Sequence, residues 1–377
     1  MKNGVLKSKK NPIFLRFLNQ TRIIVLSFIV VIFIGSGLLM LPFSQKTSIS
    51  YLDALFTATT ATCVTGLSTI EIANALTPFG QVVVFFLVQI GGMGFMTLAS
   101  ATFVLFGHRF SLRERLNMRE YLSETDMSEL RRLAVNVVRM TVIIEGAGVV
   151  LLTAAFAFEY SFGTALWYGV FHSVSAFCNA GLDIIPVGDS VSLYSGNAFV
   201  LVVLALLIVA GGLGFIVIGD VVRTRKWSKM RMDSKIVLSV SGVLLLFGTL
   251  VYMIFEYNNP ATLGEMNFGN KLANAFFFSA STRTAGFASF PIADLKPVSR
   301  TVTIALMFIG ASPASTGGGI KTTTLFVLIV WISAFVRQKR LTVIGMKKVG
   351  SEVRSKAATV LVLAIASLLV AQMLLTG

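Results

Sequence analysis

The sequence feature that most constrains the fold is a series of long apolar runs. Each is near the roughly 20 residues that a helix needs to cross the hydrocarbon of a bilayer. The composition agrees, since 55% of the residues are hydrophobic and 13% are charged, against about 25% charged in soluble domains. We therefore predict a multi-pass, all-α membrane protein with seven spans. The runs lie near residues 23–41, 79–107, 140–158, 197–222, 236–255, 301–336 and 357–376.

The net charge of +15 is distributed in a way that predicts orientation in the membrane. Lys and Arg concentrate before the first run and in every second loop, whereas few lie in the alternate loops. Cytoplasmic loops carry such an excess of positive charge. This distribution favours insertion in the plasma membrane with a cytoplasmic N-terminus over binding to nucleic acid. The segments predicted to be cytoplasmic are 1–22, 108–132, 223–235 and 337–356.

Three short segments between the runs repeat one pattern. FTATTATCVTG (56–66), FHSVSAFCNAG (171–181) and FFFSASTRTAG (276–286) each begin with Phe and end with Gly. Each lies on the predicted outer side. The helical stretches here, 51–61, 164–177 and 271–281, are too short to span a bilayer. They are typical of pore helices that enter the membrane and stop.

The repeats divide the chain into units of span, pore helix, glycine turn and span. A further similarity, IGGMGF (90–95) and AGGLGF (210–215), lies in the runs that follow the first two turns. The repeat boundaries predicted on this basis are 23–107 for repeat 1, 133–222 for repeat 2, 236–336 for repeat 3 and 357–377 for the first span of a fourth unit.

The glycine turns predict an ion filter. Irregular backbone at membrane depth must be buried in protein or line a watery path, and glycine adopts backbone angles that other residues avoid. Several such turns on one axis would present carbonyl oxygens that replace the hydration shell of a monovalent cation, as in potassium filters. The residues predicted to bind K⁺ through their backbone are Val64, Thr65, Gly66, Asn179, Ala180, Gly181, Thr284, Ala285 and Gly286.

The run 301–336 is too long for one straight span and contains ASPASTGGGIK. Pro313 and the glycines 317–319 disfavour a continuous helix, so two half-helices around a loop are expected. The loop is either a kink packed among helices or a flexible barrier across the pore. A charged Lys in hydrocarbon is costly, so it should face the pore or an acidic partner. The candidate gate residues are Ser315, Thr316, Gly317, Gly318, Gly319 and Lys321.

Other polar residues in the apolar runs allow two interpretations. Glu145 lies within the third run, where an ionisable group suggests either transport or hydrogen bonding between helices. Arg283, three residues before Gly286, would repel cations, so we expect it behind the filter and paired. Cys63 and Cys178 occupy the matching positions in the other repeats and are expected to pack, since thiolates suit soft metals.

The turns ATCVTGL, AFCNAGL and STRTAGF, together with ASPASTGGGIKTTT (311–324), resemble the pore-forming subunits of the Trk/Ktr/HKT superfamily of potassium transporters, most closely the KtrB type. The resemblance covers nearly the whole chain. It implies four covalently joined units around one pore, a gating loop below the filter, and often a homodimer. It also implies a cytosolic, nucleotide-binding regulatory subunit of the KtrA type, with K⁺ as the transported ion, Na⁺ as a possible modulator and no cofactor in this chain.

The sequence contains neither a fourth pore helix nor a fourth glycine turn. Either the sequence is truncated, or something else supplies the fourth wall of the pore. Because three walls do not enclose an ion, we expect the 377-residue chain by itself not to support potassium uptake.

Two function classes follow from these observations. The first is potassium uptake through a channel-like filter. The second is a secondary ion carrier, or a membrane enzyme, that uses intramembrane acid groups. The second class needs carboxylates or His near the midplane, and only Glu145 qualifies. We therefore expect a transporter rather than an enzyme.

Overall fold

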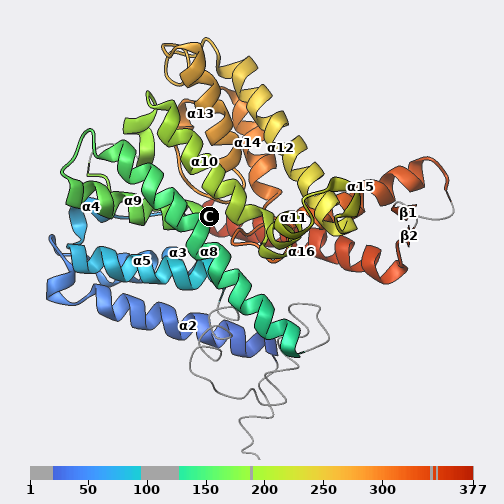
Figure 1. The fold of residues 1–377 in the computed structure, drawn as a ribbon, viewed down its shortest axis with the longest axis horizontal. Coiled ribbons are helices and arrows are strands. Elements are labelled where there is room, and N and C mark those ends of the chain that lie inside the picture. The colour runs from blue at the N-terminus through green and yellow to red at the C-terminus, as the bar shows by residue number, and fades with distance from the viewer. Residues whose placement is uncertain (1–19, 95–126, 187–189, 340–342, 345–346, 377) are drawn as a thin grey trace, which may run out of the picture.

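A computed structural model describes residues 20–94, 127–186, 190–339, 343–344 and 347–376. Within these ranges the regular structure is almost entirely helical (Figure 1), which confirms the predicted all-α class. The exception there is a small antiparallel hairpin of strands β1 (Val343–Ile344) and β2 (Lys347–Lys348). Most of the predicted cytoplasmic segments 1–22 and 108–132, and the end of the run 79–107, lie outside the described residues.

The first unit is a three-helix arrangement in which a short helix lies between two longer ones. Its short helix begins with a capping box, because the Ser50 hydroxyl accepts from the backbone N–H of Asp53 and the Asp53 carboxylate accepts from that of Ser50. Hydrogen bonds from Ser50 and Thr69 hold the pKa of the Asp53 carboxyl below its ordinary value. The elements are α2 (Gln20–Leu39), η1 (Pro42–Ser44), α3 (Tyr51–Cys63), α4 (Ile72–Ala75) and α5 (Pro78–Met93).

The second unit repeats this arrangement but differs from the sequence prediction in its last run. The run 197–222 was expected to be one span, whereas the structure divides it into two helices bent by 99° at Gly214. Gly214 has φ 89°, a backbone angle that side-chain-bearing residues rarely adopt. The elements are α8 (Met127–Phe156), α9 (Phe162–Phe177), η2 (Ser190–Tyr194), α10 (Ala198–Leu213) and α11 (Phe215–Thr224).

The third unit contains the break that the sequence predicted in the run 301–336. Helix α14 ends at Phe308 and α15 begins at Thr322, so the residues between them form a loop. A last long helix, α16, follows the hairpin and packs on α15. The elements of this unit are α12 (Met232–Glu256), α13 (Phe268–Ser281), η4 (Ile292–Asp294), α14 (Pro297–Phe308) and α15 (Thr322–Val336). The short helix η3 (Trp227–Lys229) precedes the unit, and α16 (Ser351–Thr376) follows it.

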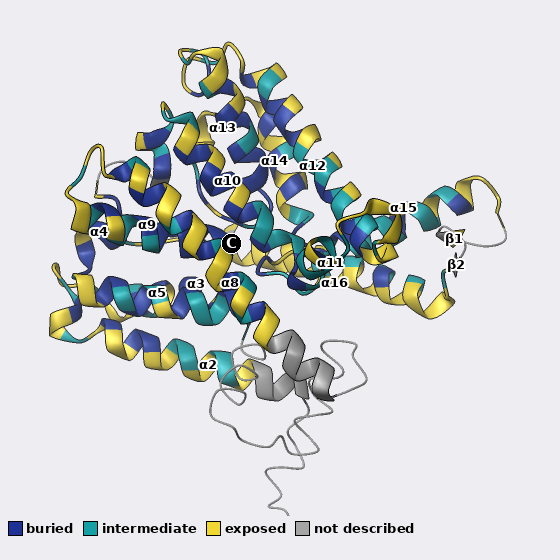
Figure 2. Ribbon diagram, in the orientation of Figure 1, coloured by how far each residue is buried: buried dark blue, intermediate teal, exposed yellow. Residues whose placement is uncertain are grey.

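The three units pack side by side, with the second between the other two (Figure 1). Helix α5 contacts α9, and α10 contacts α13. Buried residues gather in the interior, including much of the short helices α3, α9 and α13 (Figure 2). The outward faces of α2, α12 and α16, by contrast, expose apolar side chains such as Phe33, Leu246 and Met373. An apolar exterior of this extent is typical of a protein surrounded by lipid.

Three described helices are long and apolar enough to cross a membrane, and the bent pair α10–α11 would be a fourth span. They are Val135–Phe156, Met232–Glu256 and Ser351–Leu374. Shorter apolar helices occupy the other predicted runs, namely Val25–Leu39, Pro78–Met93, Pro297–Phe308 and Thr322–Val336. Every predicted run therefore contains helix in its described part, but Gly214 interrupts the run 197–222 and the loop between Phe308 and Thr322 interrupts the run 301–336.

Candidate functional site

Each short helix ends in a turn whose backbone alternates in handedness. In every turn the first and third of the predicted filter residues have positive φ, and the middle residue does not. In an extended chain, consecutive carbonyl groups point to opposite sides. When residues with positive φ alternate with residues with negative φ, consecutive carbonyl groups point to the same side instead. The residues with positive φ are Val64 and Gly66, Asn179 and Gly181, and Thr284 and Gly286.

The three turns meet at one point. A Cβ atom built on Gly66 would lie 2.9 Å from the Cα of Gly286 and 3.0 Å from the carbonyl oxygen of Ala180. A Cβ atom on Gly181 would lie 2.7 Å from the Cα of Gly286. Real Cβ atoms do not approach other atoms so closely, and the positive φ at Gly66 independently favours glycine. The structure thus brings together residues that are far apart in the sequence.

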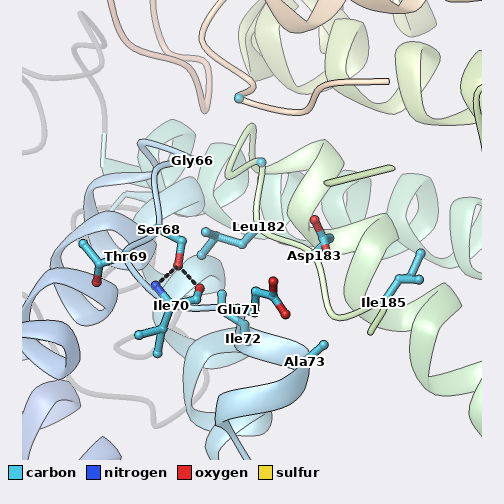
Figure 3. A pocket seen from close by; sticks show the side chains of 12 residues that line it. Gly66, Ser68, Thr69, Ile70, Glu71, Ile72, Ala73, Leu182, Asp183 and Ile185 are labelled. Atoms are coloured by element: carbon cyan, nitrogen blue, oxygen red, sulfur yellow. Dashed lines mark hydrogen bonds between the residues drawn. The ribbon is translucent and has the colours of Figure 1, made fainter. Parts of the chain in front are cut away.

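An open cavity of about 340 Å³ adjoins the three glycines. The rest of its wall is made by residues that follow the glycines in the first and second turns, and Figure 3 shows two carboxylates among them, Glu71 and Asp183. The Glu71 carboxylate accepts a 2.6 Å hydrogen bond from Asn74. Acidic side chains at the approach to a filter favour the entry of cations.

The loop between α14 and α15 lies against the residues that precede the glycines. The hydroxyl of Thr316 donates to the carbonyl of Phe177, at 3.0 Å, and the backbone N–H of Gly318 donates to the hydroxyl of Thr284, at 3.1 Å. A Cβ atom on Gly317 would lie 2.6 Å from the Thr284 hydroxyl and 2.9 Å from the side-chain amide of Asn179. Two predicted filter residues therefore contact the predicted gate loop.

The loop is also tied to itself and to the bend at Gly214. The ammonium of Lys321 donates a 2.7 Å hydrogen bond to the carbonyl of Gly317. The N–H of Ser312 donates to the carbonyl of Gly212, and that of Phe215 donates to the carbonyl of Ala314, both at 3.0 Å. This bend was not predicted from the sequence, where the signal for it was the glycine-rich AGGLGF.

The other polar residues singled out in the sequence have different surroundings. Glu145 is 8% exposed and accepts from the Gln89 amide at 3.3 Å, so hydrogen bonding between helices α5 and α8 is the observed arrangement. The buried thiol of Cys178 lies 3.9 Å from the same carboxylate. Arg283 is buried, and its pairing stays a prediction.

Cys63, by contrast with Cys178, is exposed. It lines a second cavity of about 340 Å³ between the first and third turns, together with Thr65, Thr284 and Gly318.

Three comparisons with known proteins give one answer. The protein family described as TrkH, cation transport protein, matches residues 2–377. The chain is 37% identical to the potassium/sodium uptake protein NtpJ of Enterococcus hirae, over 85% of this chain and 71% of that protein. It is 38% identical to the Ktr system potassium uptake protein B of Vibrio alginolyticus, over 94% of this chain and 78% of that protein.

A solved structure has the same fold. The crystal structure of the potassium transporter TrkH from Vibrio parahaemolyticus aligns with a TM-score of 0.67 at 19% sequence identity. The alignment covers 91% of this chain and 68% of that one. At 19% sequence identity, this similarity supports a shared fold and nothing more specific.

Proposed function

This chain belongs to the TrkH family of cation transport proteins, and from that premise we propose that it takes up potassium ions through the point where its glycine turns meet. The observation that carries this proposal is the convergence of Gly66, Gly181 and Gly286 from three units, in turns of alternating handedness. Carbonyls presented in this way replace the hydration shell of K⁺ at little cost. The names of the similar proteins, which refer to potassium uptake, support the same ion.

The path of the ion follows from the surroundings of the turns. Cations gather in the cavity that bears Glu71 and Asp183, lose water at the backbone carbonyls of residues 64–66, 179–181 and 284–286, and then meet the loop of residues 315–319. That loop is the gate. Its contacts with Thr284 and with the carbonyl of Phe177 support a barrier next to the filter, and its glycines allow it to change shape.

The carrier mechanism based on Glu145 is less well supported. The carboxyl is enclosed between helices, where Gln89 and Cys178 surround it, instead of lining the cavity at the glycines. Potassium passage through a filter involves no covalent chemistry, so the protein is not an enzyme in this proposal and needs no cofactor of its own. Na⁺ acts at most as a modulator.

The setting of the transporter is also part of the proposal. The protein lies in the plasma membrane with its N-terminus in the cytoplasm, as the alternation of basic loops favours. It forms a homodimer, and a cytosolic nucleotide-binding subunit of the KtrA type regulates it. The name of the Ktr system protein B, which denotes one component of a system, supports a regulatory partner.

Potassium uptake is tested in bacterial cells that lack their own potassium transporters. Because three walls do not enclose an ion, the test uses the full chain, by which we mean this chain with a fourth pore unit supplied. We expect cells that make the full chain together with a KtrA-type subunit to grow at low external K⁺ and to accumulate ⁸⁶Rb⁺, with little inhibition by Na⁺. Cells that carry the empty vector provide the background. Accumulation that depends on a proton gradient and shows no preference for K⁺ over Na⁺ would contradict the filter and favour the carrier.

A further inference from the structure

A hydroxyl-bearing residue near the end of each short helix holds the turn that follows at two places. In the first unit this residue is Thr60. Its backbone carbonyl accepts from the N–H of Thr65, at 2.9 Å. Its hydroxyl accepts from the N–H of Leu67, at 3.1 Å. The two hydrogen bonds therefore lie on either side of Gly66.

The second unit makes the same connections with one more hydrogen bond. The carbonyl of Ser175 accepts from the N–H of Ala180, at 2.7 Å. The Ser175 hydroxyl accepts from the N–H of Leu182, at 3.1 Å, and donates to the carbonyl of the same residue, at 2.6 Å. Gly181 is thus fixed between two bonded neighbours.

The third unit reaches the same result from a shifted position. The carbonyl of Ser281 accepts from the N–H of Ala285, at 2.9 Å, and its hydroxyl donates to the carbonyl of Phe287. Ser281 precedes Gly286 by five residues, whereas Thr60 and Ser175 precede their glycines by six. An overlay of the three sequences pairs Thr60 and Ser175 with Ala280, so the pattern appears only in three dimensions.

These hydrogen bonds are inside the protein. Thr60, Ser175 and Ser281 are 3%, 1% and 4% exposed. If a hydroxyl is removed there, a backbone group beside the filter loses its partner at a place where water reaches poorly. The backbone of the turn then becomes more mobile next to the carbonyl groups that bind the ion, because glycine restricts the backbone angles only weakly.

We propose that Thr60, Ser175 and Ser281 are positioning residues, here called the filter clamps, that set the preference for K⁺ over Na⁺. This inference rests on the proposed function. The selectivity of a carbonyl filter depends on the size of the ring and on the direction of its dipoles, and both depend on how firmly the backbone is held. Each clamp fixes the residue before the glycine and the residue after it, so the ring does not contract around a smaller ion.

The chain contains matched controls on the same helices. Ser173 lies two residues before Ser175 on α9, is buried, and donates to the carbonyl of Glu145 at 2.7 Å. Ser279 lies two residues before Ser281 on α13, is buried, and donates to the carbonyl of Leu245 at 2.9 Å. Both hydroxyls connect helices and do not contact a turn in these hydrogen bonds.

The test compares the K⁺ over Na⁺ uptake ratio of the full chain, with its regulatory subunit, in cells and in proteoliposomes. We expect Ser175→Ala and Thr60→Val to lower the ratio by roughly two- to tenfold, which is the effect of one net hydrogen bond. Thr60→Ser, which keeps the hydroxyl, should restore it. Ser173→Ala and Ser279→Ala should keep the parent ratio even where they lower the protein yield.

The outcomes separate this inference from the proposed function. A selective parent whose Ser175→Ala and Thr60→Val variants remain equally selective overturns the filter clamps alone. The same holds if Ser173→Ala lowers the ratio as much as Ser175→Ala does. If Ser175→Ala does not accumulate, the pair Thr60→Val and Thr60→Ser decides. A parent without preference for K⁺ overturns the proposed function and the clamps with it.

Discussion

At the scale of the residue, Gly66 lies so close to the third turn that an added Cβ atom would be 2.9 Å from the Cα of Gly286. The regular distance from Phe to Gly in three segments was enough to find these glycines in the sequence. The filter clamps could not be found in that way, because Ser281 lies one residue nearer to its glycine than Thr60 and Ser175 lie to theirs. Sequence patterns reveal backbone requirements such as positive φ more readily than hydrogen bonds across a turn.

Replacement of Gly66 by Ser should weaken the preference for K⁺ over Na⁺. The new Cβ atom must displace the turn of Gly286 or that of Ala180, and the positive φ adds strain. The measurement is ⁸⁶Rb⁺ uptake by the full chain at increasing Na⁺. Gly163→Ser, at a position with open space at the start of α9, is the matched control. Selectivity equal to that of the parent in the Gly66→Ser protein would refute the assignment of the filter.

At the scale of the element, the loop between α14 and α15 combines a predictable break with an unpredicted partner. Pro313 and the successive glycines indicated that the helix would stop. The partner is the bend at Gly214, which the loop contacts through the hydrogen bond from Phe215 to Ala314. The sequence contained the glycines of this bend, but a long apolar run alone does not distinguish a straight helix from a bent pair.

Deletion of residues 314–319 should raise potassium flux and make it less dependent on the regulatory subunit, while the selectivity set by the glycine turns stays the same. Thr316→Val, which removes the hydrogen bond to Phe177, should act in the same direction with a smaller effect. Flux through proteoliposomes is the measurement, and Thr301→Val on the exposed face of α14 is the control. A deletion protein that folds normally but conducts no faster than the parent would leave the loop as a packing kink.

At the scale of the whole molecule, the three units form one body with apolar residues both in its interior and on its surface. The apolar runs predicted the helices and their repetition, because hydrocarbon dictates both. The order in which the units pack could not be predicted. It depends on contacts such as those of α5 with α9 and of α10 with α13, which leave no periodic signal in the sequence.

The orientation in the membrane is open to a direct test. In a protein with Cys63 replaced by Ser, a cysteine at Glu265 should react with a membrane-impermeant maleimide added to intact cells. A cysteine at Lys229, in the basic segment 223–235, should react only after the cells are permeabilised. Both positions are exposed, so burial does not cause a difference in labelling between them. The difference reports the orientation, which is set by the excess of positive charge on the cytoplasmic side. The opposite labelling pattern would invert the topology.

The shifted position of Ser281 affects the way in which such a filter changes over generations. In a ring built from identical subunits, one codon substitution alters every wall at once. Here the turns belong to a single gene and are already unequal, since Ser281 reaches Phe287 from a different distance along the chain than Ser175 reaches Leu182. A mutation therefore changes one wall while the others are inherited intact, and natural selection can adjust ion preference in small, separate steps.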